Sequence, residues 1–366
     1  MDNQPMSSRP GCWLVLLLVC TGCAHPVTDQ GNGIRLEYLG QATFPTGYEY
    51  KGTAVGGLSG IDYDPASNSY VVISDDRAAR GPVRFYEVTI DLADGSLEEG
   101  DVVFSGVTSI QDRDGQSFAV GAVDPEAVRV APDGSLLWVS EGDGRSAPFV
   151  RQMRRTGEFI AEHLPPPYYT PGARTGTREN KAFESLALSL GGKRMLAATE
   201  NALKQDGPAA TLENGSPVRL LVLDNASGRR QAEYIYVTDP VAEAPRPANG
   251  FATNGLVELL AIDDRQLIAL ERSFSRSRGN RIRLFLTDTD SAVDVAGLKS
   301  IAGHDIRTMP KQLLLDLDEL GVRLDNIEGM SLGAPLPDGS RTLILVSDNN
   351  FNQLQLTQVL AFRLVE

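Results

Sequence analysis

The sequence predicts an all-β protein, a β-propeller built from five repeats. Each repeat opens with a short apolar string containing an acid or a serine, and an acid ending a β-rich run follows 13 to 20 residues later. The first strings are LSGID, PEAVRV, FESLAL, LVELLAI and IEGMSL, and the second runs are YVVISDD, LLWVSEG, MLAATEN, QLIALER and LILVSDN. The first strings recur every 58 to 74 residues. Repeats of a few short strands are typical of propeller blades, here lengthened by loops.

A third apolar-alternating run follows each pair. These runs are VRFYEVTID, FVRQMRR, VRLLVLD, IRLFLTD and VLAFRLV. A fourth run often comes next, as in GDVVFSGVTSI or AEYIYVTD. Period-2 alternation, interrupted by turn pairs such as DG, NG and GG, predicts four antiparallel strands in a complete repeat.

The last repeat has three runs before the chain ends at Glu366. We expect the apolar stretch at residues 34–44 to supply its missing outer strand and close the ring, because an open sheet edge is a liability. A six-bladed ring remains an alternative if residues 143–183 or 225–257 hold a degenerate blade. The leucine spacing in residues 310–321 predicts a helix inserted between blades.

Composition fits a single acidic domain. The 366 residues include 36 Gly and 21 Pro, which suits a fold rich in turns, and the formal net charge is −14. So acidic a chain disfavours nucleic acid and anionic lipid surfaces as partners and favours bound cations. The sequence does not indicate an oligomeric state.

The N-terminus has the features of an export signal. An apolar run at residues 12–20 follows Arg9, and it is too short to span a bilayer. Its end, Thr21-Gly22-Cys23, resembles a bacterial lipobox, in which the cysteine is lipidated. We therefore expect a signal peptide at 1–22, lipidation of Cys23, a linker at 23–33 and one propeller domain at 34–366. The protein would then be anchored in the cell envelope, at an outer membrane facing the periplasm; ordinary signal cleavage is the alternative.

The three cysteines, Cys12, Cys20 and Cys23, all lie in this N-terminal segment. The predicted domain at 34–366 therefore contains neither a disulfide nor a thiol nucleophile.

The repeated acids are expected to meet at one face of the propeller. In each hairpin the start of the first strand lies beside the end of the second. The first strands bring Ser59, Glu126, Glu184, Glu258 and Glu328 to the mouth of the central channel. The second strands bring Asp75, Glu141, Glu200, Glu271 and Asp348.

Converging carboxylates repel one another, and a cation relieves the repulsion. Oxygen ligands without a histidine or cysteine cluster favour Ca²⁺ over zinc. We expect the metal ligands to be Glu126, Glu184, Glu258, Glu328, Asp75 and Asp348. The alternative is that these acids accept hydrogen bonds between blades, as Glu271 beside Arg272 suggests.

The loops after the second strands are basic. Arg77, Arg272 and Arg276 are the expected binding residues for a small anionic ester such as a phosphate ester, because guanidinium groups recognise such oxyanions. The alternative is that these arginines form surface ion pairs of little energetic importance.

A serine-nucleophile motif is present but is not expected to act. Residues 329–333 read GMSLG, which fits G-x-S-x-G, yet that motif requires a sharp strand-to-helix turn. Ser331 instead falls inside a predicted innermost strand. None of the three histidines, His25, His163 and His304, occupies a repeated position that would supply a base.

These strings together resemble the bacterial phytase-like family, whose members carry the description of esterase-like activity. The resemblance is carried by GGLSGIDYD (56–64), DPEAVRV (124–130), ENKAFESLALS (179–189), NGLVELLAI (254–262) with LIALERSF (267–274), and NIEGMSL (326–332) with VSDNNF (346–351). It implies a β-propeller and, through distant kinship with calcium-dependent propeller phytases, hydrolysis of phosphate monoesters. It assigns no catalytic residue.

Two other functions remain open from the sequence. One is a non-catalytic envelope protein that binds a ligand or partner on the acidic face. The other is a calcium-dependent lactonase, which would use one central metal and an apolar pocket.

Overall fold

The computed structural model describes Met1 and residues 33–365. The predicted signal peptide, most of the linker and Cys23 lie outside the described residues. Contacts divide the chain into Met1–Gly33 and Ile34–Glu366, and the second unit is the propeller. None of the helices in the described part of the chain has the length and apolar character needed to cross a bilayer.

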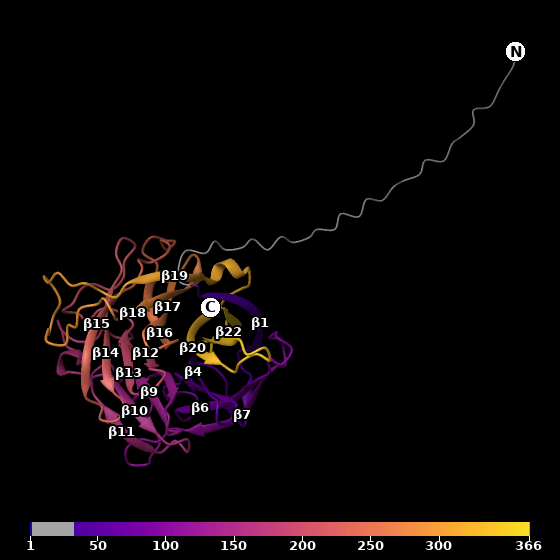
Figure 1. Cartoon of the computed structure of the whole chain (residues 1–366), viewed down its shortest axis with the longest axis horizontal. Coiled ribbons are helices and arrows are strands. Elements are labelled where there is room, and N and C mark those ends of the chain that lie inside the picture. The colour runs from indigo at the N-terminus through magenta and orange to yellow at the C-terminus, as the bar shows by residue number, and fades with distance from the viewer. Residues whose placement is uncertain (2–32, 366) are drawn as a thin grey trace. The chain divides into compact units, whose positions relative to one another are not determined.

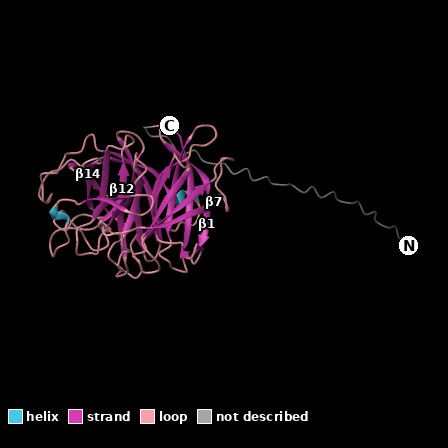
Figure 2. Ribbon diagram, turned by 90° about the horizontal axis from the view of Figure 1, so that it is seen from below, coloured by secondary structure: helices cyan, strands magenta, loops and turns pink. Residues whose placement is uncertain are grey.

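Five four-stranded antiparallel sheets are arranged around a central axis, which confirms the predicted five-bladed propeller (Figure 1). The innermost strands contact one another around the axis. From the inside outward, the blades are β4 (Leu58–Asp64), β5 (Ser69–Ser74), β6 (Arg84–Ile90) and β7 (Val102–Ser109); β8 (Pro125–Val130), β9 (Leu136–Ser140), β10 (Phe149–Met153) and β11 (Phe159–His163); β12 (Phe183–Leu188), β13 (Arg194–Thr199), β14 (Pro217–Asp224) and β15 (Arg230–Val237); β16 (Ala252–Ala261), β17 (Gln266–Ser275), β18 (Gly279–Asp288) and β19 (Lys311–Asp316); and β20 (Asn326–Gly333), β21 (Arg341–Asp348), β22 (Leu356–Val365) and β1 (Arg35–Pro45). Figure 2 shows the strands running between two layers of loops.

The N-terminal strand closes the ring, as the sequence predicted. β1 pairs with β22 in antiparallel register from Arg35 opposite Val365 to Pro45 opposite Leu356. The fifth blade therefore combines the two ends of the domain. A short hairpin of β2 (Glu49–Tyr50) and β3 (Thr53–Ala54) follows before the first blade.

The predicted helix at residues 310–321 is wrong. This segment forms the outer strand β19 and then a single 3₁₀ turn, Leu317–Leu320, whose N-cap is Asp316. The exposed edge of β18 is the physical reason, because pairing with it satisfies backbone groups that a local helix would leave open. The Asp316 carboxylate also accepts hydrogen bonds from Arg281 (2.7 Å) and Arg283 (3.0 Å) on β18, which fixes the strand there.

The core lies between blades. Five apolar clusters each join residues of two neighbouring blades, including the pair formed by the first and last blades. Because every blade buries both faces, its strands read as nearly continuous apolar runs in the middle, and polar residues gather at the ends. The two ends of the strands are therefore the places where chemistry can be located.

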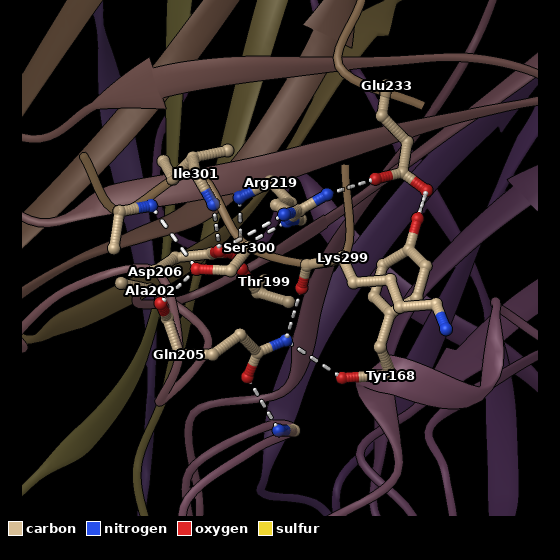
Figure 3. Close-up of polar contacts among 12 residues, drawn as sticks. Tyr168, Thr199, Ala202, Gln205, Asp206, Arg219, Glu233, Lys299, Ser300 and Ile301 are labelled. Atoms are coloured by element: carbon tan, nitrogen blue, oxygen red, sulfur yellow. Dashed lines mark hydrogen bonds and ion pairs between the residues drawn. The ribbon is translucent and has the colours of Figure 1, made fainter. Parts of the chain in front are cut away.

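A buried ionic cluster ties two long insertions to the third blade (Figure 3). Arg219 of β14 donates hydrogen bonds to Asp206 (2.6 Å) and Glu233 (2.6 Å), and all three side chains are fully buried. Glu233 also accepts from the Tyr168 hydroxyl (2.5 Å), and Asp206 accepts from the backbone N–H of Ile301 (3.0 Å). The cluster thus joins the segment containing the 3₁₀ turn Pro167–Tyr169 and the 289–310 loop to one blade.

Candidate functional site

A polar basin of about 970 Å³ opens at the end of the propeller where the innermost strands begin. Side chains from all five blades line it. Its acidic side chains on or next to the two inner strands of the blades are Asp75, Asp124, Glu126, Glu184, Glu200, Glu328 and Asp348. Six of the nine repeated acids therefore line one basin, whereas Glu141, Glu258 and Glu271 are not among its lining residues.

The hairpins place these acids by backbone pairing. The Glu141 N–H donates to the Asp124 carbonyl (3.1 Å), and the Glu200 N–H donates to the Ala182 carbonyl (2.8 Å). Every innermost strand also carries a bulge, near its start in four blades and in the middle of β16. A bulge re-aims a side chain. In this way Glu126, Glu184 and Glu328 reach the basin.

The second blade supplies the tightest acidic cluster. Carboxylate oxygens of Asp124, Glu126 and Glu141 lie within 4.8 Å of one another, and all three residues are buried. Glu141 accepts a hydrogen bond from the backbone N–H of Ala182, and Asp124 lies 3.3 Å from Arg77. This cluster has the geometry to hold a metal ion.

Several of these carboxylates lack a donor. Within residues 33–365, no hydrogen bond reaches the carboxylates of Asp75, Glu126 or Glu184. Oε1 of Glu200, a residue only 2% exposed, is also without a hydrogen-bond partner. Buried polar groups are ordinarily satisfied. Convergent carboxylate oxygens without donors fit a metal ion, and this basin offers such a set.

The electrostatics point the same way. Burial, aided by the Glu200 charge, raises the pKa of Glu184 to about 8. Burial also raises the pKa of Asp124 to about 6 and that of Asp348 to about 6, against a usual 3.8. The pKa values of Asp75 and Glu126 are raised well above their usual ranges for the same reason. A bound cation would favour the ionised forms and reverse these shifts.

Three cationic side chains that line the basin contact acids of the inner strands or next to them. Arg272 contacts Glu328 and the Asn326 side-chain oxygen (2.9 Å), and Lys181 contacts Glu200 (2.9 Å). Arg77 is the third, next to Asp124. Arg77 and Arg272 are two of the residues that the sequence predicted to bind substrate. Each cation is already next to a carboxylate.

Comparison with known proteins identifies the family of the chain. The phytase-like family described as "esterase-like activity of phytase" matches residues 53–351. The chain belongs to this family. A search of curated proteins returns no match.

Among solved structures, the chain is similar to one titled "Structure of Dos1 propeller". The TM-score is 0.34 and the identity 8%, over 84% of this chain and 68% of that one. It is also similar to the tail fibre of Staphylococcus aureus phage P68, with a TM-score of 0.43 and 8% identity over 90% of this chain and 52% of that one.

One expected ligand of the phytase-like domain does not reach the basin. Letter by letter Glu258 aligns with Glu184, but the bulge in β16 places Val257 at the position that Glu184 occupies in β12. A shift of one residue turns a side chain to the opposite face. Glu258 instead is fully buried, 2.8 Å from Arg129, and accepts hydrogen bonds from the backbone N–H groups of Leu186 and Leu259. Burial raises its pKa to about 7.

Glu271 is a structural acceptor, which is the alternative raised from the sequence. Its carboxylate accepts from Tyr236 (2.7 Å), Lys311 (2.7 Å) and Asn254 (2.9 Å). Its cationic partner is therefore Lys311 and not the adjacent Arg272.

Arg276 is not among the basin-lining residues. Its backbone N–H donates to the Phe251 carbonyl (3.1 Å) at the rim. Of the three arginines predicted to bind substrate, Arg77 and Arg272 therefore line the basin and Arg276 does not.

Ser331 is fully buried in β20, as predicted for an innermost strand. Its hydroxyl lies 3.1 Å from the Asp62 carboxylate and accepts from the Tyr63 N–H (3.1 Å). It occupies neither a strand-to-helix turn nor the basin lining. The geometry of a serine nucleophile is absent at this residue.

Sequence reasoning missed Asp124, Lys181 and two aromatic residues of the basin, Phe251 and Phe274. The signal for Asp124 was present, because it stands two residues before Glu126. Lys181 and Phe251 occur outside the repeated strings, so no repeat pattern marks them.

Proposed function

We propose that this domain is a calcium-dependent hydrolase that cleaves a small anionic ester, with a phosphate monoester as the first candidate. The observation that carries the proposal is the group of carboxylates without hydrogen-bond donors, Asp75, Glu126 and Glu184, in the same basin as Arg77 and Arg272. The family's description as esterase-like supports ester chemistry, although fold and family alone do not fix a substrate.

The chain's residues divide into two groups by their contacts. Asp124, Glu126 and Glu141 would hold a first cation, and Asp75 and Glu184 extend the set of oxygen ligands. Glu328 and Asp348 accept hydrogen bonds from the protein already, including those from Asn326, so they would act as outer ligands. Among the described residues, those that line the basin include no histidine or cysteine, which favours Ca²⁺ over zinc.

When bound, such a cation polarises a phosphoryl or carbonyl oxygen and makes a nearby water easier to deprotonate. Arg272 projects from β17 into the basin, where it can contact the anionic group of the ester and orient it. Lys181 is held by Glu200 and Thr253, both at 2.9 Å, so its ammonium group has a fixed position. These side chains would bind and position the substrate.

The test combines metal analysis with a substrate panel. The purified domain is assayed for bound Ca²⁺ and for turnover of phosphate monoesters, aryl esters and lactones, with and without chelator. We expect phosphatase activity that chelator abolishes and Ca²⁺ restores. Arg272→Met should raise KM by about tenfold or more, whereas Arg229→Met, on the opposite face of the same propeller, should not.

The Ser331→Ala variant tests the alternative that a serine, and not a metal ion, carries out the reaction. Turnover that survives chelation but disappears in Ser331→Ala would overturn the metal-dependent proposal, because it would assign the reaction to the serine.

Non-catalytic ligand binding is the second candidate, because Arg77, Lys181 and Arg272 each already have a carboxylate partner. A folded, calcium-loaded domain without turnover on any ester class would favour it. Hydrolysis of lactones alone would favour a lactonase.

We further propose that the protein is exported and lipidated at Cys23, on the strength of the TGC motif and the preceding apolar run. Cys23→Ser should abolish fatty-acyl labelling and release the protein from the membrane fraction. Retention of Cys23→Ser in that fraction would contradict the proposal.

A further inference from the structure

The basin also has apolar lining residues, which are Phe251, Phe274, Val322 and Leu324. The rings of Phe251 and Phe274 are 6.0 Å apart at 38°, and Phe251 is 62% exposed. A paired aromatic surface at the rim of an otherwise charged cavity provides a place for a flat apolar group to stack.

Strand geometry places Phe274 next to Arg272 on the face of β17 that lines the basin. Arg272 and Phe274 lie two residues apart on β17 and both line the basin, whereas Glu271 and Ser273 line a small cavity on the other side of the strand. Side chains two residues apart on a strand share a face and are separated by about 7 Å. Thr253, opposite Phe274 in the ladder, holds Lys181. A ligand that contacts Arg272 with an anionic group therefore extends its other end toward the two phenylalanines.

The charges in the basin argue against a polyanion. Nine carboxylate and five cationic side chains of the described residues line it. Of the cations, Arg77, Lys181, Arg272 and Arg278 are each paired with carboxylates. The described side chains therefore leave few unpaired cations to compensate a substrate with several phosphate groups. One anionic group, shared between a bound cation and Arg272, fits this balance of charge.

We propose that the substrate is a phosphate monoester whose alcohol carries an aromatic or similarly flat apolar group, which stacks on Phe251 and Phe274. This inference rests on the proposed function and names its substrate class. Hydrolysis breaks the bond between phosphorus and the alcohol oxygen. Water supplies the new oxygen on phosphorus, and one of its protons goes to the departing alcohol.

The kinetic test uses two esters of similar chemical reactivity. Benzyl phosphate and ethyl phosphate both release an unactivated primary alcohol, so a difference in kcat/KM reports binding of the phenyl ring. We expect a preference of about tenfold or more for benzyl phosphate. The ratio should fall toward one in Phe251→Ser and Phe274→Ser. Leu190→Ser, which changes an exposed residue in the turn on the opposite face, is the control. Equal kcat/KM values for the two esters in the wild type would overturn the inference.

A binding experiment separates this inference from the proposed function. Benzylphosphonate and ethylphosphonate, which are not hydrolysed, are titrated into the Ca²⁺-loaded domain by calorimetry. Tighter binding of benzylphosphonate, lost in Phe251→Ser, supports the aromatic subsite even if no ester is turned over, in which case only the hydrolase proposal fails. Equal binding of the two phosphonates, with phosphatase activity intact, overturns the aromatic subsite alone.

Discussion

Burial and the neighbouring Glu200 charge both raise the pKa of Glu184, from its usual 4.5 to about 8. A raised pKa means that the metal-free folded protein binds a proton that the unfolded chain releases. Stability is then lost as the pH rises from about 4.5 to about 8. Without a bound cation, Glu184 therefore lowers the stability of the fold at neutral pH, and a cation bound beside it would remove this effect.

Glu184→Gln should stabilise the metal-free protein and weaken the stabilisation that Ca²⁺ gives. In chelator at pH 8, the free energy of unfolding should rise by about 1 kcal/mol or more, because a buried like charge is removed. In excess Ca²⁺, stabilisation by the metal should shrink by about 1.4 kcal/mol if one ligand is worth a tenfold change in affinity. Thermal melts with and without Ca²⁺ measure both effects.

The matched control is Glu158→Gln, which removes an exposed carboxylate in the turn between β10 and β11. It should change neither melt by more than a few tenths of a kilocalorie per mole, roughly the range for an exposed pair. A Glu184→Gln protein that melts like wild type in both conditions would show that this carboxylate neither repels its neighbours nor binds metal.

Among the elements, the third blade depends on the buried Arg219 cluster. Arg219→Met would leave Asp206 and Glu233 buried without their guanidinium partner. Removing one member of a buried pair costs about 3–5 kcal/mol. Urea melts should show a loss of this size, and the 289–310 loop should exchange its amide hydrogens faster.

Arg229→Met, an exposed change in the same blade, should melt like wild type. If Arg219→Met loses less than about 1 kcal/mol, the cluster does not hold the insertions to the blade.

The elements also show what sequence patterns can and cannot predict. The five blades and the closing strand at 34–44 could be predicted, because period-2 alternation and a repeated strand-end acid reflect how blades pack. The predicted helix at 310–321 failed because its leucines fit both periods, and pairing with β18 decided between them. Local propensity contained no information about that free edge.

The same limit explains the site. Glu126, Glu184 and Glu328 could be assigned to the basin because their strings align without ambiguity. The position of Glu258 could not be predicted, because a bulge moves the register by one residue and cannot be recognised in the amino-acid sequence. Phe251 and Lys181 lie in segments without a repeat, so only their three-dimensional positions reveal them.

At the scale of the whole molecule, ring closure by β1 should control cooperativity. A chain that begins at residue 46 lacks β1 and leaves β22 as an open edge. We expect it to lose several kilocalories per mole of stability and to aggregate, whereas a chain that begins at residue 33 should melt like the longer protein. Denaturant melts and light scattering measure the two effects.

Adding a peptide of residues 34–45 in trans should restore the melt of the truncated chain, because the peptide can re-form the ladder with β22. A chain beginning at residue 46 that melts cooperatively at the full-length midpoint, without peptide, would show that β1 is dispensable for closure.

The basin also makes the calcium response depend on pH. The pKa values of Asp124 and Asp348 are about 6, and that of Glu184 is about 8, all raised by burial. Because the metal-free folded state holds these protons more tightly than the unfolded chain, its stability should fall as the pH rises from 5 to 8, by roughly 2 kcal/mol or more. Ca²⁺ requires the ionised carboxylates, so its binding should strengthen over the same interval.

The quantity to measure is the melting temperature with Ca²⁺ minus that in chelator, at each pH. Taking this difference cancels the general repulsion of a chain with a net charge of −14, which acts in both conditions. The difference should be near zero at pH 5 and largest at pH 8, and Glu184→Gln should flatten its upper part, since this residue has the highest of the three pKa values. A difference that stays constant from pH 5 to pH 8 would mean that Ca²⁺ binds somewhere other than these carboxylates.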